Sequence, residues 1–210
     1  RFNRKWISPK GVNLLFSVLL RPSQAHLSQI NMAATIAVSN TVRKFTKLQP
    51  TIKWPNDVRL RHRKVAGILI ESTFKGQSLQ YSVLGIGINV NFVTSASLEI
   101  SDTATSMLIE SGQQYDLIKI LGSTIETLDD LYARISKNES LVEEWASELD
   151  TLGQTIRLES HGNVIEGTAE SVDRQGNLVL RKRDGSVFTA VAGEVTLQTK
   201  NDTYSENTRC

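Results

Sequence analysis

The spacing of hydrophobic residues changes along the chain and divides it into segments of different type. Residues 12–20 (VNLLFSVLL) are almost wholly apolar, as expected for a strand that is covered on both faces. TIKW at 51–54, KVAGILIESTF at 64–74 and LQYSVLGIGINV at 79–90 predict further strands, the last two joined as a hairpin across residues 75–78. From Ser23 onward apolar side chains recur at helical spacing, which predicts a helix of about 20 residues that packs on the sheet, with Leu27, Ile30, Ala34, Ala37, Val38 and Phe45 on its buried face.

Three further helical patterns follow the hairpin. Asp102 is expected to cap a short helix through Met107 and Leu108 that ends at Gly112. Asp116 is expected to cap a longer one, and a third surrounds Trp145. The apolar stripe of the longer helix comprises Leu117, Leu121, Ile125, Leu128, Tyr132 and Ile135. The first part of the chain therefore reads as an α+β fold, an antiparallel or mixed sheet with helices packed on one face.

The helical period disappears after Leu152. Residues 153–198 show about five short β-rich runs separated by turn signals at 161–163, 175–177 and 184–185, a spacing typical of a small β-barrel. We therefore expect one domain over residues 1–151, a second over 152–199, and a disordered polar tail over 200–210.

Composition narrows the class of protein. With 210 residues and 40% hydrophobic content the chain can bury a core, and its net charge of +2 does not demand a nucleic-acid partner. The single cysteine, Cys210, excludes an intramolecular disulfide and a cysteine zinc cluster. No apolar run reaches the roughly 20 residues that span a bilayer, and no signal peptide leads the chain, so we expect a cytoplasmic protein without a membrane partner. Because the chain opens with RFNRKW, we expect it to begin inside a longer protein.

The segment KWPNDV at 53–58 precedes KVAGILIE at 64–71. Two interpretations of Asp57 and Lys64 in these segments are open. In one interpretation one strand ends, residues 55–57 turn, and Lys64 enters the next strand beside Asp57 as part of a functional site. In the other, Asp57 is an ordinary turn residue and Lys64 ends a solvated basic run, residues 61–64. Spacing alone favours the second interpretation.

Two other segments could contact a ligand. GIGIN at 85–89 lacks the third glycine and the following helix of a dinucleotide-binding turn, but glycines inside a strand often mark a close approach of ligand to backbone. Arg1, Arg4 and Lys5 precede Trp6, a combination that suits an anionic ligand with a flat ring or, equally, a surface loop beside a partly buried tryptophan. The three histidines have neither metal-ligand nor nucleophile–base spacing.

Five segments, in this order, resemble the catalytic domain of bacterial-type biotin protein ligases. They are RKWISPKGVNLLFSVLLRP, KWPNDV, KVAGILIE, GIGINVN and TATSMLIESG, and the resemblance extends from residue 1 to about 198. It implies the class II synthetase-like fold of biotin and lipoate ligases, followed by an SH3-like barrel. It also implies a two-step reaction, in which biotin and Mg²⁺-ATP form biotinyl-5′-adenylate and the biotinyl group passes to one lysine of a biotin carboxyl carrier protein, as in acetyl-CoA carboxylase.

The resemblance assigns the catalytic roles to Lys64 and Asp57. Lys64 matches the lysine of the family's KxAGI motif, which contacts biotin and the carboxyl group linked to phosphate. Asp57 matches the aspartate of the WPND motif, which either helps to organise Mg²⁺-ATP or orients the incoming lysine amine.

Ligand-binding roles are implied for Arg1, Trp6, Asn56, Gly67 and Asn89. Arg1 resembles the last residue of the GRGR loop that folds over the adenylate, and Trp6 the tryptophan that walls the pocket. Gly67 would let the ligand approach its strand, Asn56 would fix the turn, and Asn89 would read the adenine edge or, alternatively, cap a strand end.

In family members the rest of the GRGR loop and a Ser-Thr-Asn segment lie before residue 1, so we expect the isolated segment to be weak or inactive. The N-terminal winged-helix domain of repressor-type members is also absent, so this segment gives no support for DNA binding. A homodimer is compatible with the resemblance. Two alternatives stay open: a lipoate or octanoate ligase of the same fold, and a non-catalytic module that binds protein or RNA, which would leave Lys64 and Asp57 without a task.

Overall fold

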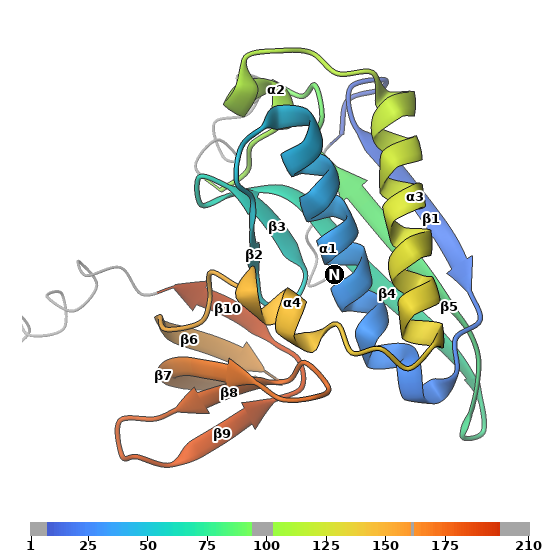
Figure 1. The fold of residues 1–210 in the computed structure, drawn as a ribbon. Coiled ribbons are helices and arrows are strands. Elements are labelled where there is room, and N and C mark those ends of the chain that lie inside the picture. The colour runs from blue at the N-terminus through green and yellow to red at the C-terminus, as the bar shows by residue number, and fades with distance from the viewer. Residues whose placement is uncertain (1–7, 94–102, 161, 198–210) are drawn as a thin grey trace, which may run out of the picture.

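The computed structural model describes residues 8–93, 103–160 and 162–197, which form two antiparallel sheets and the helices that accompany the first (Figure 1). The first sheet has the strand order β1-β5-β4-β3-β2 and the second β10-β6-β7-β8-β9. The elements are β1 (Leu14–Leu20), a 3-10 turn η1 (Gln24–His26), α1 (Leu27–Thr46), β2 (Thr51–Lys53), β3 (Asp57–Leu60), β4 (Arg63–Lys75), β5 (Ser78–Ile88), α2 (Met107–Ser111), α3 (Leu117–Ser136), α4 (Val142–Ser147), β6 (Thr155–Ser160), β7 (Asn163–Val172), β8 (Leu178–Arg181), β9 (Val187–Ala190) and β10 (Glu194–Leu197).

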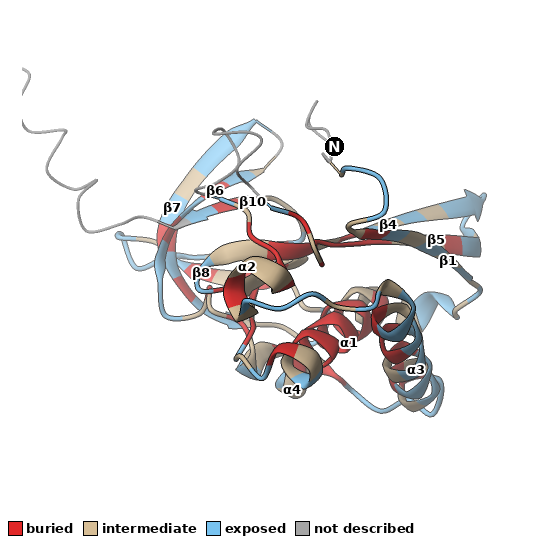
Figure 2. Ribbon diagram, turned by 90° about the horizontal axis from the view of Figure 1, so that it is seen from above, coloured by how far each residue is buried: buried red, intermediate tan, exposed pale blue. Residues whose placement is uncertain are grey.

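Helices cover one face of the first sheet, which we call the inner face. Helix α1 lies against the strands and α3 packs alongside α1, both on the same side of the sheet (Figure 2). Alternate residues of three neighbouring strands meet there in rows, such as Ala66 with Ile88 and Leu14, so apolar side chains are removed from water at every second position. The expected α+β architecture is confirmed. None of the helices in the described ranges is long and apolar enough to span a bilayer.

The segment between KWPN and Lys64 contains a strand that sequence reasoning missed. Asp57–Leu60 pairs with β2 on one side and β4 on the other, and the reversal lies at Arg61 and His62, both with positive φ. The strand is only four residues long and half of it is charged, so its apolar signal was confined to Val58 and Leu60, which are fully buried. Asp57 thus begins a strand and does not lie in a turn.

Helix α2 begins later than predicted. Its N-cap is Ser106, whose hydroxyl accepts a hydrogen bond from the Ile109 N–H at 3.1 Å, whereas Asp102 lies outside the described residues. The segment before Ser106 cannot be helical because its backbone pairs with Lys64 as a short parallel bridge. Gly112 ends α2 with φ 76°, and Asp116 caps α3, as predicted.

The second part of the chain forms five strands where a small barrel was expected. Buried Ile156, Leu158, Ala169, Leu178 and Leu180 give this second sheet its own apolar face. Among the described residues no pairing joins the end strands β9 and β10, so the element is an open antiparallel sheet of the SH3-like kind and not a closed barrel. The tail over residues 200–210 lies outside the described residues.

Candidate active site

The face of the first sheet opposite α1, which we call the outer face, carries a strip without side chains. The register aligns Asp57 on β3 with Gly67 on β4 and Gly87 on β5, and Gly85 follows in the next row opposite Leu69. We call Gly67, Gly85 and Gly87 the glycine floor. Three neighbouring glycines at the centre of a sheet leave room for a ligand to lie directly on the backbone.

The backbone does not require glycine at these positions. None of Gly67, Gly85 and Gly87 has a positive φ, so an L-residue could adopt each conformation. At Gly85 an added Cβ would meet nothing closer than the Leu69 carbonyl oxygen at 3.6 Å, an ordinary contact. No strained turn therefore explains these glycines. Gly67 and Gly85 are partly exposed, whereas Gly87 is buried, so the room for a ligand lies at the first two.

A β-bulge places Lys64 on this outer face. Simple alternation along β4 would point Lys64 to the inner face with Ala66, but the register passes from Val58↔Ala66 to Arg59↔Lys64 and leaves Val65 as an extra residue. The Lys64 ammonium consequently lies 2.5 Å from the Asp57 carboxylate oxygen Oδ1. The Lys64 side chain is 34% exposed and that of Asp57 25%, so both can still meet a ligand.

The backbone of Lys64 is held on both sides. Besides its pairing with β3, its N–H donates to the Thr103 carbonyl at 2.9 Å and its carbonyl accepts from the Thr105 N–H at 2.8 Å. Residue Glu110 of α2 anchors this segment, since its carboxylate accepts from the Thr105 hydroxyl at 2.6 Å and pairs with Arg63 at 2.7 Å. Three members of the basic run, Arg61, Arg63 and Lys64, therefore have ion-pair partners, so the run is more than a solvated charged face. Sequence reasoning missed Glu110, because nothing local linked it to the run.

Positive charge gathers at the β2–β3 edge of the outer face. Lys53 lies opposite Asp57 in the register, and Arg59 occupies the same face and pairs with Asp150 at 3.5 Å. Burial lowers the pKa of Lys53; Asp57 opposes this shift and neighbouring Arg59 adds to it. The position of Lys53 beside Asp57 puts a partly buried ammonium next to the candidate catalytic pair.

Two asparagines brace the site. The Asn56 amide donates to the Ile68 carbonyl at 2.6 Å, while the Ile68 N–H donates to the Asn56 carbonyl at 3.0 Å, which ties the 54–56 turn to β4. Asn89, 6% exposed, donates to the Thr105 carbonyl at 3.0 Å and accepts from Asn13 at 3.3 Å. The observed contacts of Asn89 are those of a strand-end brace, and its contact with adenine stays a prediction.

The remaining candidates fall elsewhere. Arg1 and Trp6 lie outside the described residues. Within the described ranges no group of three or more His, Cys, Asp or Glu side chains could hold a metal ion.

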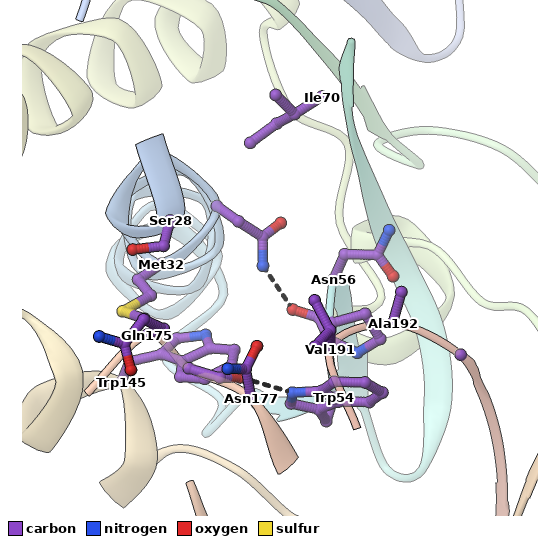
Figure 3. A pocket seen from close by; sticks show the side chains of 14 residues that line it. Ser28, Met32, Trp54, Asn56, Ile70, Trp145, Gln175, Asn177, Val191 and Ala192 are labelled. Atoms are coloured by element: carbon purple, nitrogen blue, oxygen red, sulfur yellow. Dashed lines mark hydrogen bonds between the residues drawn. The ribbon is translucent and has the colours of Figure 1, made fainter. Parts of the chain in front are cut away.

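A cavity of about 440 Å³ lies away from this face, between α1, the 54–56 turn and two loops of the second sheet (Figure 3). Trp54 and Trp145 contribute their indoles to its lining, and Asn56 and Asn177 contribute amides. Neither Lys64 nor the glycine floor lines it. It marks the contact between the two sheets and not the site on the outer face.

Comparison with known proteins identifies the class. Residues 1–89 match the model of the biotin/lipoate A/B protein ligase family, and residues 151–198 match that of the biotin protein ligase C-terminal domain. The fold and these two matches thus place the chain in the class of the biotin and lipoate protein ligase family.

The relatives narrow that class. The chain is 31% identical to the biotin–(acetyl-CoA-carboxylase) ligase of Mycobacterium tuberculosis over 93% of this chain and 73% of that protein. It is 29% identical to the bifunctional ligase/repressor BirA of Escherichia coli, over 94% of this chain and 62% of BirA. A solved structure of biotin protein ligase from Aquifex aeolicus in complex with biotin and ATP superposes with TM-score 0.80 at 27% identity, covering 94% of this chain and 83% of that one. The chain belongs to the biotin protein ligase family, and it spans about three-fifths of the length of BirA.

Proposed function

We propose that the protein activates biotin with ATP and transfers it to a lysine of a biotin carboxyl carrier protein. Support comes from family membership and from the similar Aquifex aeolicus structure, which contains biotin and ATP. The observation that carries the proposal is the position of Lys64, which the bulge at Val65 turns onto the outer face beside the glycine floor and Asp57.

The first step must bring two anions together. A carboxylate oxygen of biotin attacks the α-phosphorus of ATP, a P–O bond forms, and pyrophosphate leaves with the electron pair of the broken bond. An ammonium at Lys64 offsets the repulsion between the carboxylate and the phosphate and stabilises the charge that develops during the attack. Lys53 and Arg59 add positive charge at the same edge, where the triphosphate would lie.

In the second step the carrier lysine amine attacks the biotinyl carbonyl carbon and a C–N bond forms. The C–O bond to the phosphate breaks, AMP leaves with its electron pair, and the amine nitrogen loses a proton. The glycine floor lets the ligand lie against the backbone, which helps to exclude the water that would hydrolyse a mixed anhydride. Asp57 would serve by holding Lys64 in place, by adding a carboxylate to Mg²⁺-ATP or by orienting the carrier amine. Its contact with Lys64 favours a role that begins in the first step.

In this proposal residues 1–151 form the catalytic domain. The second sheet, within residues 152–199, would contact the carrier protein and help to close the nucleotide site. The β1 edge of the first sheet offers a surface for a homodimer, since Leu15 and Leu19 are more than half exposed. The carrier protein would also need an exposed surface near the site to bind to.

The test is biotin-dependent ATP–pyrophosphate exchange by the purified full-length protein, because the isolated segment is expected to be weak or inactive. We expect Lys64→Ala to lower the rate by about 100-fold or more, the loss typical for removal of a charge that stabilises a transition state. Lys75→Ala, at the exposed end of the same strand, serves as the matched control and should exchange at the parental rate. If Lys64→Ala also exchanges at the parental rate, the assignment of Lys64 is wrong.

The same assay addresses the nearest alternatives. Residues 1–89 match a family model that covers lipoate ligases as well, so lipoate should be offered in place of biotin. We expect exchange with biotin only. Exchange that depends on lipoate would point to a lipoate ligase, and no exchange with either acid would favour a binding module.

A further inference from the structure

Trp54 connects the candidate catalytic edge with the second sheet. It lies between Lys53 and Asp57, which face each other in the β2–β3 pairing, so residues 54–56 form the whole connection between the two strands. The indole is 2% exposed, and its N–H donates to the Gly176 carbonyl at 2.9 Å. The Trp54 backbone N–H donates to the Thr151 hydroxyl at 2.9 Å. Both N–H groups of Trp54 therefore donate to residues beyond position 150.

The acceptor carbonyl belongs to a rigid turn. The Asp173 carboxylate accepts hydrogen bonds from the backbone N–H groups of Gln175 and Asn177, each at 2.9 Å, and from the Asn177 amide at 2.8 Å. Gly176 has φ 78°, and a Cβ on it would lie 2.5 Å from Cε of Met32 and 3.3 Å from the Trp145 ring. The turn is thus fixed internally and fits closely against α1 and α4.

The neighbouring backbone continues this connection. The Ile52 N–H donates to the Glu148 carbonyl at 2.8 Å, and the Asp150 N–H donates to the Ile52 carbonyl at 3.0 Å. Strand β2 therefore lies between β3 and the segment that leads into the second sheet. A displacement of that segment or of the Gly176 turn would be transmitted to the start of β3, where Asp57 lies.

We propose that Trp54 and the Gly176 turn are positioning elements, through which the second sheet holds Asp57, and with it Lys64, in the geometry that the reaction needs. The inference deepens the proposed function and rests on it for its kinetic part. The structural part, that the Trp54–Gly176 hydrogen bond orders the start of β3, does not depend on the activity.

Two variants and a control test the proposal. Trp54→Phe retains an aromatic ring but removes the N–H that reaches Gly176, together with part of the ring volume. Ile135→Ala is the control for lost buried volume, because it truncates a fully buried side chain of α3, a helix that does not line the cavity beside the Gly176 turn. Asp173→Ala removes the carboxylate whose hydrogen bonds hold the Gly176 turn. It tests the same connection at a residue that is only partly buried.

Hydrogen exchange of the backbone amides at residues 56–60 gives the structural readout. We expect faster exchange there in Trp54→Phe and Asp173→Ala, and parental exchange in Ile135→Ala. If Trp54→Phe leaves exchange at these amides no faster than Ile135→Ala does, the positioning role is wrong whether or not the protein is a ligase.

Kinetics provides the second readout. We expect kcat of biotin-dependent pyrophosphate exchange to fall about tenfold in Trp54→Phe, with KM for biotin unchanged, because small displacements of reacting groups cost large factors in rate. Ile135→Ala should stay within about twofold of the parental kcat even where its melting temperature falls. An equal fall in kcat for both variants would overturn the proposal. A parental protein that lacks biotin-dependent exchange would instead contradict the proposed function and leave the hydrogen-exchange comparison to decide the coupling.

Discussion

The two faces of strand β4 are built for different purposes from neighbouring residues. On the inner face Ala66 and Ile68 lie under α1 in the continuous apolar core. On the outer face the same strand presents Lys64, Gly67 and Leu69, which are partly or largely exposed. The inner face gains stability from every side chain, whereas the outer face gives up side-chain contacts at its glycines and keeps a charged pair at its edge. Stability and chemistry are thus separated by the alternation of one strand.

The comparison predicts that changes on the inner face affect folding and those on the outer face affect reaction. Because the β-bulge at Val65 is the point at which a residue changes face, variants on either side of it should separate the two properties. The variants below are ordered by the size of the expected free-energy change, from the largest to the smallest.

Ile68→Ala should show the largest effect, confined to stability. Ile68 is buried in the core under α1, and its truncation should lower the free energy of unfolding by about 2–5 kcal/mol. KM for biotin and ATP should stay at the parental values at temperatures where the variant is folded. Urea unfolding and exchange kinetics on the same preparation would check this, and a selective rise in KM would contradict the division between the faces.

Gly67→Val should have the opposite signature. A valine there projects from the glycine floor between Asp57 and Gly87, so biotin-dependent exchange should fall about 100-fold, mainly through a loss of binding. Its unfolding midpoint should change little, because valine suits a strand. Thr73→Val, on the same face of β4 near the hairpin, serves as control and should retain parental kinetics. Parental kinetics in Gly67→Val as well would show that the ligand does not lie on the glycine floor.

Asp57→Asn should have an intermediate effect on the first step. It keeps the side-chain size but removes the charge that holds the Lys64 ammonium, so we expect pyrophosphate exchange to fall roughly tenfold, equal to about 1.4 kcal/mol of barrier. A single-turnover transfer assay from preformed biotinyl-5′-adenylate to the carrier supplies the contrast. If exchange stays parental and only transfer slows, Asp57 acts on the carrier amine and not through Lys64.

Local patterns in the sequence predicted most of the fold. The cap at Asp116 and the stop at Gly112 depend on residues close together in the chain, and they were correct. The expectation that the strand within residues 12–20 is covered on both faces was wrong, because alternate residues of β1 face outward and Leu15 and Leu19 are more than half exposed. The short strand β3 was missed because its charged residues Asp57 and Arg59 point to the outer face and hide its two apolar positions.

The site could be predicted only in part, because its geometry depends on contacts between distant residues. Lys64 and Asp57 were found by resemblance, but alternation alone places Lys64 on the inner face and only the register reveals the bulge. Glu110 is 47 residues from Arg63, and Trp54 is 122 residues from Gly176, so no local pattern could link either pair. Lys53 would have been recognised once β3 was known, since paired strands bring it opposite Asp57.

Lys53→Met should show the smallest effect and should depend on pH. Burial lowers the pKa of Lys53 below the 10.5 of a free lysine, and the nearby Asp57 carboxylate compensates only in part. At pH 7 the folded protein therefore holds an ammonium that the unfolded chain solvates better, and replacing it with a methionine of similar length should raise the melting temperature slightly. As the pH rises through the folded pKa toward 10.5, the parental protein loses this penalty, because its unfolded state binds more protons, and its stability should approach that of the variant. Lys75→Met, at the exposed hairpin, should show no such convergence. If Lys53→Met is less stable than the parent at pH 7, the ammonium is a net stabilising partner of Asp57, and the charged edge contributes to folding as well as to chemistry.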